Sequence, residues 1–166
     1  MAGGALIAAR AWELTGLLPA TDANAGIEGL TWIPDAALVA GGFTDDRGRR
    51  YDPTAHPGHG GGLFVTGAEA GGRLDVFALG EGTAEHLATI PSGLPSVVEL
   101  AWDADAGTLW AACDDHCEGR MVRLALDGSG SFTVLDELSP PDGLEERNDE
   151  GLAIGACRGG TATVVW

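Results

Sequence analysis

Short alternating apolar segments, separated by Gly, Pro, Asp or Asn, run along the whole chain. A period of two is typical of half-buried β-strands, and these breakers are typical of the turns between them. The pattern predicts an all-β fold with no helix longer than one turn at 143–150. The predicted strands are 11–18, 27–33, 36–42, 62–66, 73–79, 85–90, 97–103, 107–112, 120–126, 131–136, 149–154 and 161–166.

Three of these strands open on one repeated motif. AGIEGLTWIPD (25–35), SVVELAWDADA (96–106) and RNDEGLAIGAC (147–157) each place a Glu one or two residues before a Leu, after a turn that contains Pro. Internal repetition marks repeat architectures, and antiparallel four-stranded units are typical of β-propeller blades. We therefore expect a β-propeller of four-stranded antiparallel blades.

The spacing of the motif sets the expected blade boundaries. Leu30 and Leu100 are 70 positions apart, whereas Leu100 and Leu152 are 52 apart. A polar insertion loop at 43–62 accounts for the difference, and we expect it between the second and third strands of its blade. Loops of this length are usually functional or disordered. The single domain divides into blade segments at about 1–24, 25–95, 96–146 and 147–166.

The repeat count predicts an incomplete ring. About two and a half to three blades are present, whereas a propeller closes with at least four. We expect a partial propeller, either a piece of a longer protein or one partner in an assembly that covers its sheet edges by self-association. A complete small β-sandwich is the alternative.

Charge narrows the classes of partner. The formal net charge is −16 and the sequence pI is about 4.3. Nucleic acids and anionic membranes need a basic surface, so neither is an expected partner. An acidic chain favours cations such as Ca²⁺, or reflects only solubility in salt. The start of the chain lacks the basic region of a signal peptide, so we expect a protein that is either cytoplasmic or has lost its natural N-terminus.

The three repeated acids are the first candidate metal ligands. In a propeller, Glu28, Glu99 and Glu150 would converge near the channel axis. Ionised carboxylates that lie close together need a counter-charge, and Ca²⁺ accepts oxygen ligands with tolerant geometry. Asn24 and Asn148 are the only two asparagines in the chain, and each lies just before a motif. They are either ligands or turn formers.

Two further groups of side chains are candidates for chemistry. Asp114 and Asp115 follow the second strand of their blade, and we expect Asp45 and Asp46 to follow the second strand of the first blade. Such a pair could add cation ligands or a general base. Their alternative role is to start loops.

The insertion carries the chain's densest positive charge. Arg47, Arg49 and Arg50 could bind a phosphate or carboxylate group of a substrate through paired hydrogen bonds. The same side chains could equally pair with the aspartates of the loop. His56 and His59 could bind zinc, but a third ligand is not evident nearby.

The cysteines leave three alternatives open. Cys113 and Cys117 are close enough in the sequence for a local disulfide, which would indicate an oxidising compartment. Free thiols and a metal site are the other interpretations, and Cys157 is left over. No serine-hydrolase, P-loop or HExxH motif is present in the sequence.

Three segments carry a resemblance to a known family. GIEGLTWIPDAALVAGGFTDDRGRRYDPTAHPGHGGGLFV, ELAWDADAGTLWAACDDHCEG and NDEGLAI resemble the bacterial phytase-like ("esterase-like activity of phytase") propellers, over about residues 24–166. The E-G-L-x-W opening is distantly similar to calcium-dependent lactonase and gluconolactonase propellers. There, a Glu of such a strand and Asn or Asp residues of other blades hold a catalytic Ca²⁺. The resemblance implies that Glu28 is a ligand, with Asn148 and Glu150.

Together these features predict a Ca²⁺-dependent hydrolase of small phosphoric or carboxylic esters, with the ion polarising an ester or phosphoryl oxygen. Members of the family are typically secreted, which implies an extracellular or cell-envelope location and suits a Cys113–Cys117 disulfide. The alternatives are a non-catalytic propeller that serves as a binding or scaffolding module, and a truncated inactive fragment.

Overall fold

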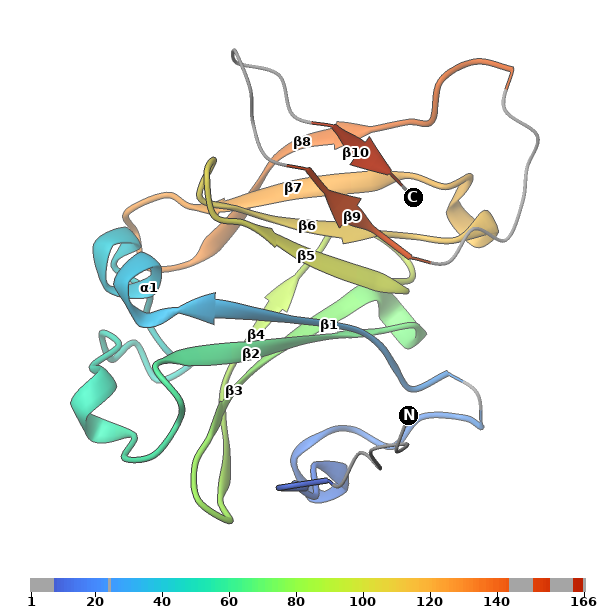
Figure 1. The fold of residues 1–166 in the computed structure, drawn as a ribbon. Coiled ribbons are helices and arrows are strands. Elements are labelled where there is room, and N and C mark those ends of the chain that lie inside the picture. Colours follow the sequence, from blue (N-terminus) through green and yellow to red (C-terminus); the bar gives the residue numbers. More distant parts are fainter. Residues whose placement is uncertain (1–7, 24, 144–150, 156–162, 166) are drawn as a thin grey trace, which may run out of the picture.

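The fold is mostly β, as expected for an all-β protein. The computed structural model describes residues 8–23, 25–143, 151–155 and 163–165 (Figure 1). A first antiparallel sheet has the order β1 (Ile27–Pro34), β2 (Gly62–Ala68), β3 (Arg73–Leu79) and β4 (Ala84–Pro91). A second has the order β5 (Glu99–Asp103), β6 (Thr108–Ala112), β7 (Met121–Leu126) and β8 (Phe132–Leu138). A small antiparallel pair joins β9 (Ala153–Ile154) and β10 (Val164–Val165).

The main strand prediction that is wrong concerns 36–42, which belongs to the helix α1 (Asp35–Gly41). Pro34 is extended and precedes the helix, and Asp35 places a carboxylate in its first turn, where the helix dipole favours negative charge. Gly42, with φ 73°, ends the helix by donating its N–H to the carbonyl oxygens of Leu38 and Val39. A short apolar run such as AALVA fits a strand or a helix by pattern alone.

Because 36–42 is a helix and not a strand, the insertion lies in a different connection from the expected one. β1 pairs directly with β2, so the long connection spans 35–61 and lies between the first and second strands, not between the second and third. Asp45 and Asp46 therefore follow a helix, and their expected equivalence to Asp114 and Asp115 is wrong. The strand expected at 11–18 is also absent: this segment has irregular backbone with one 3₁₀ turn at Thr15–Leu17.

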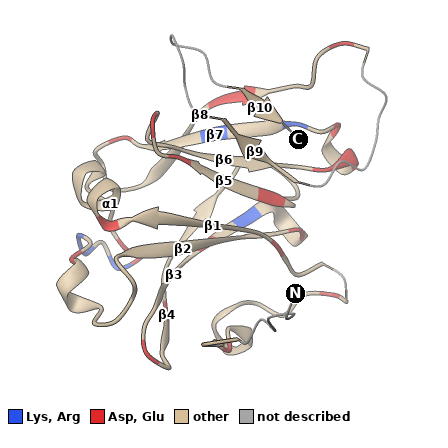
Figure 2. Cartoon of the chain, in the orientation of Figure 1, with Lys and Arg blue, Asp and Glu red and all other residues tan. Residues whose placement is uncertain are grey.

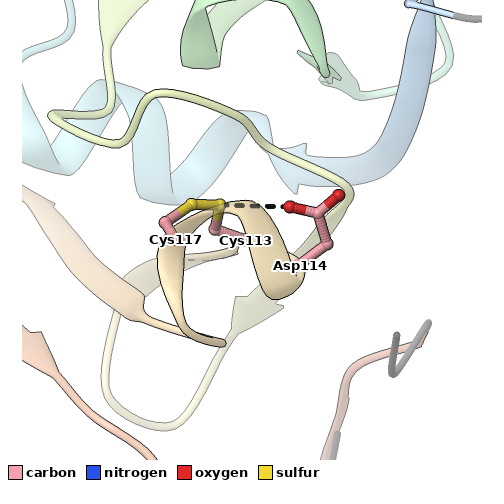
Figure 3. Close-up of side chains that lie close together, drawn as sticks. All are labelled: Cys113, Asp114 and Cys117. Atoms are coloured by element: carbon pink, nitrogen blue, oxygen red, sulfur yellow. Dashed lines mark hydrogen bonds between the residues drawn. A yellow bond between two sulfur atoms is a disulfide. The ribbon is translucent and has the colours of Figure 1, made fainter. Parts of the chain in front are cut away.

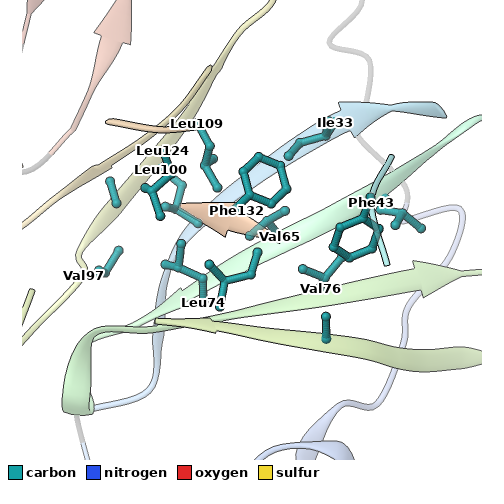
Figure 4. Close-up of a cluster of buried hydrophobic side chains, with 14 of the residues drawn as sticks. Ile33, Phe43, Val65, Leu74, Val76, Val97, Leu100, Leu109, Leu124 and Phe132 are labelled. Atoms are coloured by element: carbon teal, nitrogen blue, oxygen red, sulfur yellow. The ribbon is translucent and has the colours of Figure 1, made fainter. Parts of the chain in front are cut away.

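The two large sheets pack face to face through one apolar core. Val65 and Leu74 of the first sheet meet Leu109 and Leu124 of the second, and all four are fully buried (Figure 4). Burying a side chain of this size contributes about 1.5–3 kcal/mol to folding. The core therefore fixes how the first sheet lies on the second.

The first strands of the two sheets run side by side in the same direction (Figure 1). The Thr31 hydroxyl oxygen accepts a hydrogen bond from the Trp102 N–H, 3.1 Å away. Gly29 lies against the backbone of Glu99 and Leu100. From one contact to the other, β1 advances from Gly29 to Thr31 and β5 advances from Leu100 to Trp102. The two strands are therefore parallel neighbours, and both start at the same edge of the molecule.

The β9–β10 pair covers the other face of the second sheet. Leu152, Ile154 and Val164 pack on Trp110 and Met121. The layers therefore follow one another as first sheet, second sheet and β9–β10. The described residues do not form a closed ring of sheets, and among them no helix is long and apolar enough to cross a bilayer.

Candidate functional site

Glu28 and Glu99 lie at neighbouring strand ends. A Cβ atom at Gly29 would stand 3.0 Å from the Leu100 Cγ and 3.1 Å from the Glu99 carbonyl carbon. Such contacts are tighter than nearly all real Cβ contacts, so glycine permits this approach of β1 to β5. The structure thus places the first two repeated acids on adjacent strands at one edge.

The carboxylates of Glu28 and Glu99 both have oxygen atoms that are free to bind a cation. Glu28 is exposed, and no described residue forms a hydrogen bond or ion pair with its side chain. Glu99 is half-buried, and its Oε1 accepts the N–H of Leu100 at 3.0 Å. Its Oε2 has no partner within the described ranges. Unpaired carboxylate oxygens of this kind are the ligands that hard cations prefer.

More acids reach the same edge through the strand pairing. Ile27 pairs with Ala68, so Glu69 follows at the end of β2. Glu99 pairs with Ala112, so the loop after β6 begins there. We call this group the acidic edge; Figure 2 shows its acids on the right of the molecule. Its members are Glu28, Glu69, Glu99, Asp114 and Asp115.

Glu69 is the member of the acidic edge that sequence reasoning missed. Its Oε2 is buried and has no hydrogen-bond partner among the described residues. Leaving a carboxylate oxygen buried without a partner is costly, so a bound cation would stabilise it. The only signal in the sequence is its place at the end of the strand that pairs with the start of a repeated motif.

Asp114 organises the loop after β6. It is buried, its Oδ1 accepts the N–H of His116 at 3.1 Å, and its Oδ2 lies 3.3 Å from the His116 Nδ1. It therefore caps the 3₁₀ turn Asp115–Cys117. Asp115 is exposed and lies 3.5 Å from the same ring nitrogen. Their proposed catalytic role stays a prediction, because the contact that Asp114 shows is structural.

A disulfide closes this loop. Cys113 and Cys117 are bonded, with Cα atoms 6.0 Å apart, and the Cys113 Sγ lies 3.6 Å from the Asp114 Oδ1 (Figure 3). Of the three alternatives for the cysteines, the structure contains the disulfide; Cys157 lies outside the described residues. The cross-link holds Asp114 and Asp115 at a fixed place beside β6.

Electrostatics connect the loop to Glu69. The hydrogen bond to Asp114, followed by the charges of Asp114 and Asp115, raises the pKa of the exposed His116 imidazole above its usual value. The charge of Glu69 acts in the same direction. The end of β2 and the loop after β6 therefore lie close together, although they are distant in the sequence.

The remaining predicted ligands are not placed by the structure. Asn24, Asn148 and Glu150 lie outside the described residues. β9, the strand that follows the third motif, lies next to β5 (Figure 1). The motif strands therefore lie in the order β1, β5, β9, and the convergence of the third acid with the other two stays a prediction.

The predicted substrate-binding arginines lie elsewhere. Arg47, Arg49 and Arg50 belong to the connection that leaves the far ends of β1 and β2, on the left of Figure 2. The structure does not bring them together with the acidic edge. Arg49 pairs with Asp45, with a nitrogen–oxygen distance of 2.6 Å, which is the loop-pinning alternative.

Opposing effects set the pKa of Asp45. Partial burial acts to raise the pKa of its carboxyl group, but hydrogen bonds from the Arg49 side chain and from two backbone N–H groups outweigh it. The pKa of Asp45 is therefore held below its usual value. Arg47 and Arg50 have no ion pair with any described residue, so they alone keep a free guanidinium in this loop.

A buried polar network pins the insertion to α1. The Tyr51 hydroxyl donates to the Asp35 Oδ1 at 2.6 Å and lies 3.1 Å from the His59 Nε2. That nitrogen also lies 3.0 Å from both oxygens of Asp35. The His59 Nδ1 faces the carbonyl oxygen of His56. Both ring nitrogens of His59 are engaged, which leaves none for zinc.

Tyr51 is expected to stay protonated far into the alkaline range. Burial, followed by the hydrogen bond to Asp35 and the Asp35 charge, raises the pKa of its phenol well above its usual value near 10. A raised pKa stabilises the fold below pH 10, and this stabilisation is lost as the pH rises beyond it. Tyr51 is the only tyrosine, so the rise in absorbance at 295 nm, measured as the difference from Tyr51→Phe to remove the tryptophan signal, reports its ionisation. Phenolate should appear only as the protein unfolds; ionisation near pH 10 in the folded protein would contradict this.

Comparisons with protein-family models, with curated proteins and with solved structures found no significant match. The resemblance to phytase-like propellers therefore stays a prediction.

Proposed function

We propose that the acidic edge binds a divalent cation, Ca²⁺, and forms the reaction centre of a propeller-type hydrolase of phosphoric or carboxylic esters. The observation that carries the proposal is the gathering of Glu28, Glu69 and Glu99 at one edge, with a buried Glu69 oxygen that no described residue satisfies. Carboxylates that are brought to one edge favour a bound cation, because the cation reduces the repulsion among their charges.

The donor set fits Ca²⁺ better than a transition metal. The edge offers carboxylate oxygens from three strand ends, and Ca²⁺ accepts six to eight oxygen ligands with flexible geometry. Zinc sites are usually built from Cys and His. Here both cysteines of the edge are in the disulfide, and His116 is directed at Asp114.

The arrangement of the motif strands supports a propeller. β1, β5 and β9 are successive neighbours, each sheet meanders outward from its motif strand, and the layers stack through apolar faces. In such an arrangement the motif acids surround a common axis, and further blades would complete the ring. The disulfide fits an oxidising, extracellular compartment.

In this proposal the described residues have separate roles. Glu28 and Glu99 supply exposed and half-buried oxygens, Glu69 supplies a buried one, and Asp114 holds the neighbouring loop in place. When bound, a cation supplies Lewis-acid polarisation of an ester or phosphoryl oxygen. Asp115, an exposed member of the acidic edge, is the available carboxylate base.

A non-catalytic binding module is the second candidate. It is favoured by the structural hydrogen bonds of Asp114 and by the distance of the insertion arginines from the acidic edge. A module of this kind would bind the cation without turning over a substrate.

Hydrolysis of p-nitrophenyl phosphate and p-nitrophenyl acetate, with Ca²⁺ or with EDTA, tests the reaction. We expect Ca²⁺-dependent hydrolysis that falls at least roughly tenfold in Glu28→Gln, because a hydrogen-bonding or ligating charge is lost. Glu81→Gln removes one negative charge at the opposite end of the first sheet and should leave the rate unchanged. Cation binding without turnover would favour the binding module.

A further inference from the structure

A pocket separate from the acids of the edge lies between the N-terminal segment and the first sheet. Its volume is about 660 Å³, and it is bounded by residues 12–21 and by the ends of β1, β2 and β3 that lie near the acidic edge. Pockets of about 300–1,000 Å³ with mostly apolar walls are typical small-molecule sites.

The outer wall of the pocket is tied to the fold. The Trp12 indole N–H donates to the Gly80 carbonyl oxygen at 2.9 Å, and Arg10 pairs with Glu81 at 3.4 Å. The 3₁₀ turn Thr15–Leu17 then directs the chain back toward β1. These contacts attach the start of the segment to the β3–β4 turn, and the pocket lies between the segment and the first sheet.

Most of the wall is apolar. The N-terminal segment contributes Trp12, Leu14, Leu18 and Pro19, and the start of β1 contributes Ile27. The Ile27 side chain lines the pocket and is 43% exposed to solvent. An apolar ligand would therefore remove exposed hydrocarbon from water on both sides of the pocket.

One polar pair forms the remaining wall. Asp75 is almost completely buried, and its oxygens are bound by the Arg73 Nε at 2.8 Å, the His86 Nε2 at 2.7 Å and the Thr89 hydroxyl at 3.2 Å. Asp75 is thus saturated by its own neighbours and holds the Arg73 guanidinium in place.

Arg73 keeps free donors toward the pocket. Only its Nε has a hydrogen-bond partner among the described residues, and its side chain is 28% exposed. The terminal nitrogens of an oriented guanidinium match the two oxygens of a carboxylate. Glu13, the other charged residue of the wall, uses its carboxylate to accept the N–H of Thr15 at 2.8 Å.

We infer that this pocket binds a small amphipathic anion, with an apolar chain or ring between the segment and the sheet and a carboxylate on Arg73. Two features carry the inference: a cavity of ligand size with apolar walls, and an arginine held by a buried aspartate with its terminal nitrogens unused. It is independent of the hydrolytic reaction proposed above, because it uses none of the acids of the edge.

Titration of dodecanoate into the full chain, in Ca²⁺-free buffer and below the micelle concentration, tests the inference through tryptophan fluorescence, with Trp12→Phe identifying the contribution of Trp12 among the five tryptophans. We expect saturable one-to-one binding, with dodecanol bound roughly tenfold more weakly because it lacks the charge that Arg73 recognises. Equal affinities for the two compounds, or no saturable change, would overturn the inference.

Two variants localise the binding. Arg73→Gln should weaken dodecanoate roughly tenfold and leave dodecanol unchanged. Because this variant also disturbs buried Asp75, Leu18→Glu provides a second test on the outer segment, where it places a carboxylate in the wall and should abolish binding of dodecanoate. Its matched control is Leu17→Glu, since Leu17 is 39% exposed and does not line the pocket. Equal loss in both leucine variants would place the ligand elsewhere.

Discussion

Leu109→Ala is expected to lower the free energy of unfolding by about 3 kcal/mol. Leu109 on β6 is fully buried in the core that joins the two large sheets (Figure 4). Truncating such a side chain loses its transfer free energy and leaves a cavity, which typically costs about 2–5 kcal/mol. Urea denaturation followed by circular dichroism measures the change.

Leu135→Ala is the matched control for this prediction. Leu135 on β8 is 54% exposed, so the same truncation there removes little buried surface and should cost below about 1 kcal/mol. Equal losses in the two variants would show that the interface between the sheets does not carry the stability assigned to it.

Gly29→Val is expected to lower the free energy of unfolding by about 2 kcal/mol and to weaken cation binding. A Cβ atom at this position already meets the Leu100 side chain and the Glu99 backbone at 3.0–3.1 Å, and valine adds two further methyl groups. Overpacking of this kind typically costs about 1–3 kcal/mol. It would also separate the strand ends that carry Glu28 and Glu99.

Gly26→Val provides the control, because nothing lies within 4 Å of the position that its Cβ atom would occupy. Urea denaturation of both variants, with a Ca²⁺ titration of each, separates local crowding from the general effect of replacing a glycine. A Gly29→Val protein as stable as Gly26→Val would contradict the close approach of β1 to β5.

The strands were the most predictable part of the fold. Segments in which apolar and polar residues alternate, bounded by Gly, Pro or Asp, predicted the strands β1 to β8 to within two residues at each end. The helix α1 was missed because DAALVAG is too short for its periodicity to distinguish a helix from a strand. Its capping signals, Asp35 in the first turn and the left-handed Gly42, were the better guide.

The candidate site was only partly predictable. Repetition placed Glu28 and Glu99 correctly at the starts of two motif strands, and these strands lie side by side. Glu69 could not be found in this way, because it reaches the edge through the pairing of β2 with β1. The arginines of the insertion were proposed as substrate ligands because they form the densest positive charge of the chain, and that charge does not show at which end of the sheet their loop lies.

The contacts that hold the insertion were likewise invisible in the sequence. Asp35, Tyr51 and His59 are separated by up to 24 positions and meet only because α1 and the loop fold against each other. A linear pattern carries local periodicity and turn chemistry, whereas a buried polar network depends on tertiary packing. Its existence explains why a long polar insertion has a defined conformation.

Calorimetric titration of Ca²⁺ into the wild-type chain and into Glu28→Gln, Glu99→Gln and Glu81→Gln measures whether the acidic edge is a cation site. We expect one site with a Kd on the order of 10⁻⁴ M, as in extracellular calcium-binding modules. Glu28→Gln and Glu99→Gln should each weaken binding, and Glu81→Gln should bind like the wild type. Absence of binding in the wild type, or equal affinity in all four proteins, would contradict a cation site at the acidic edge.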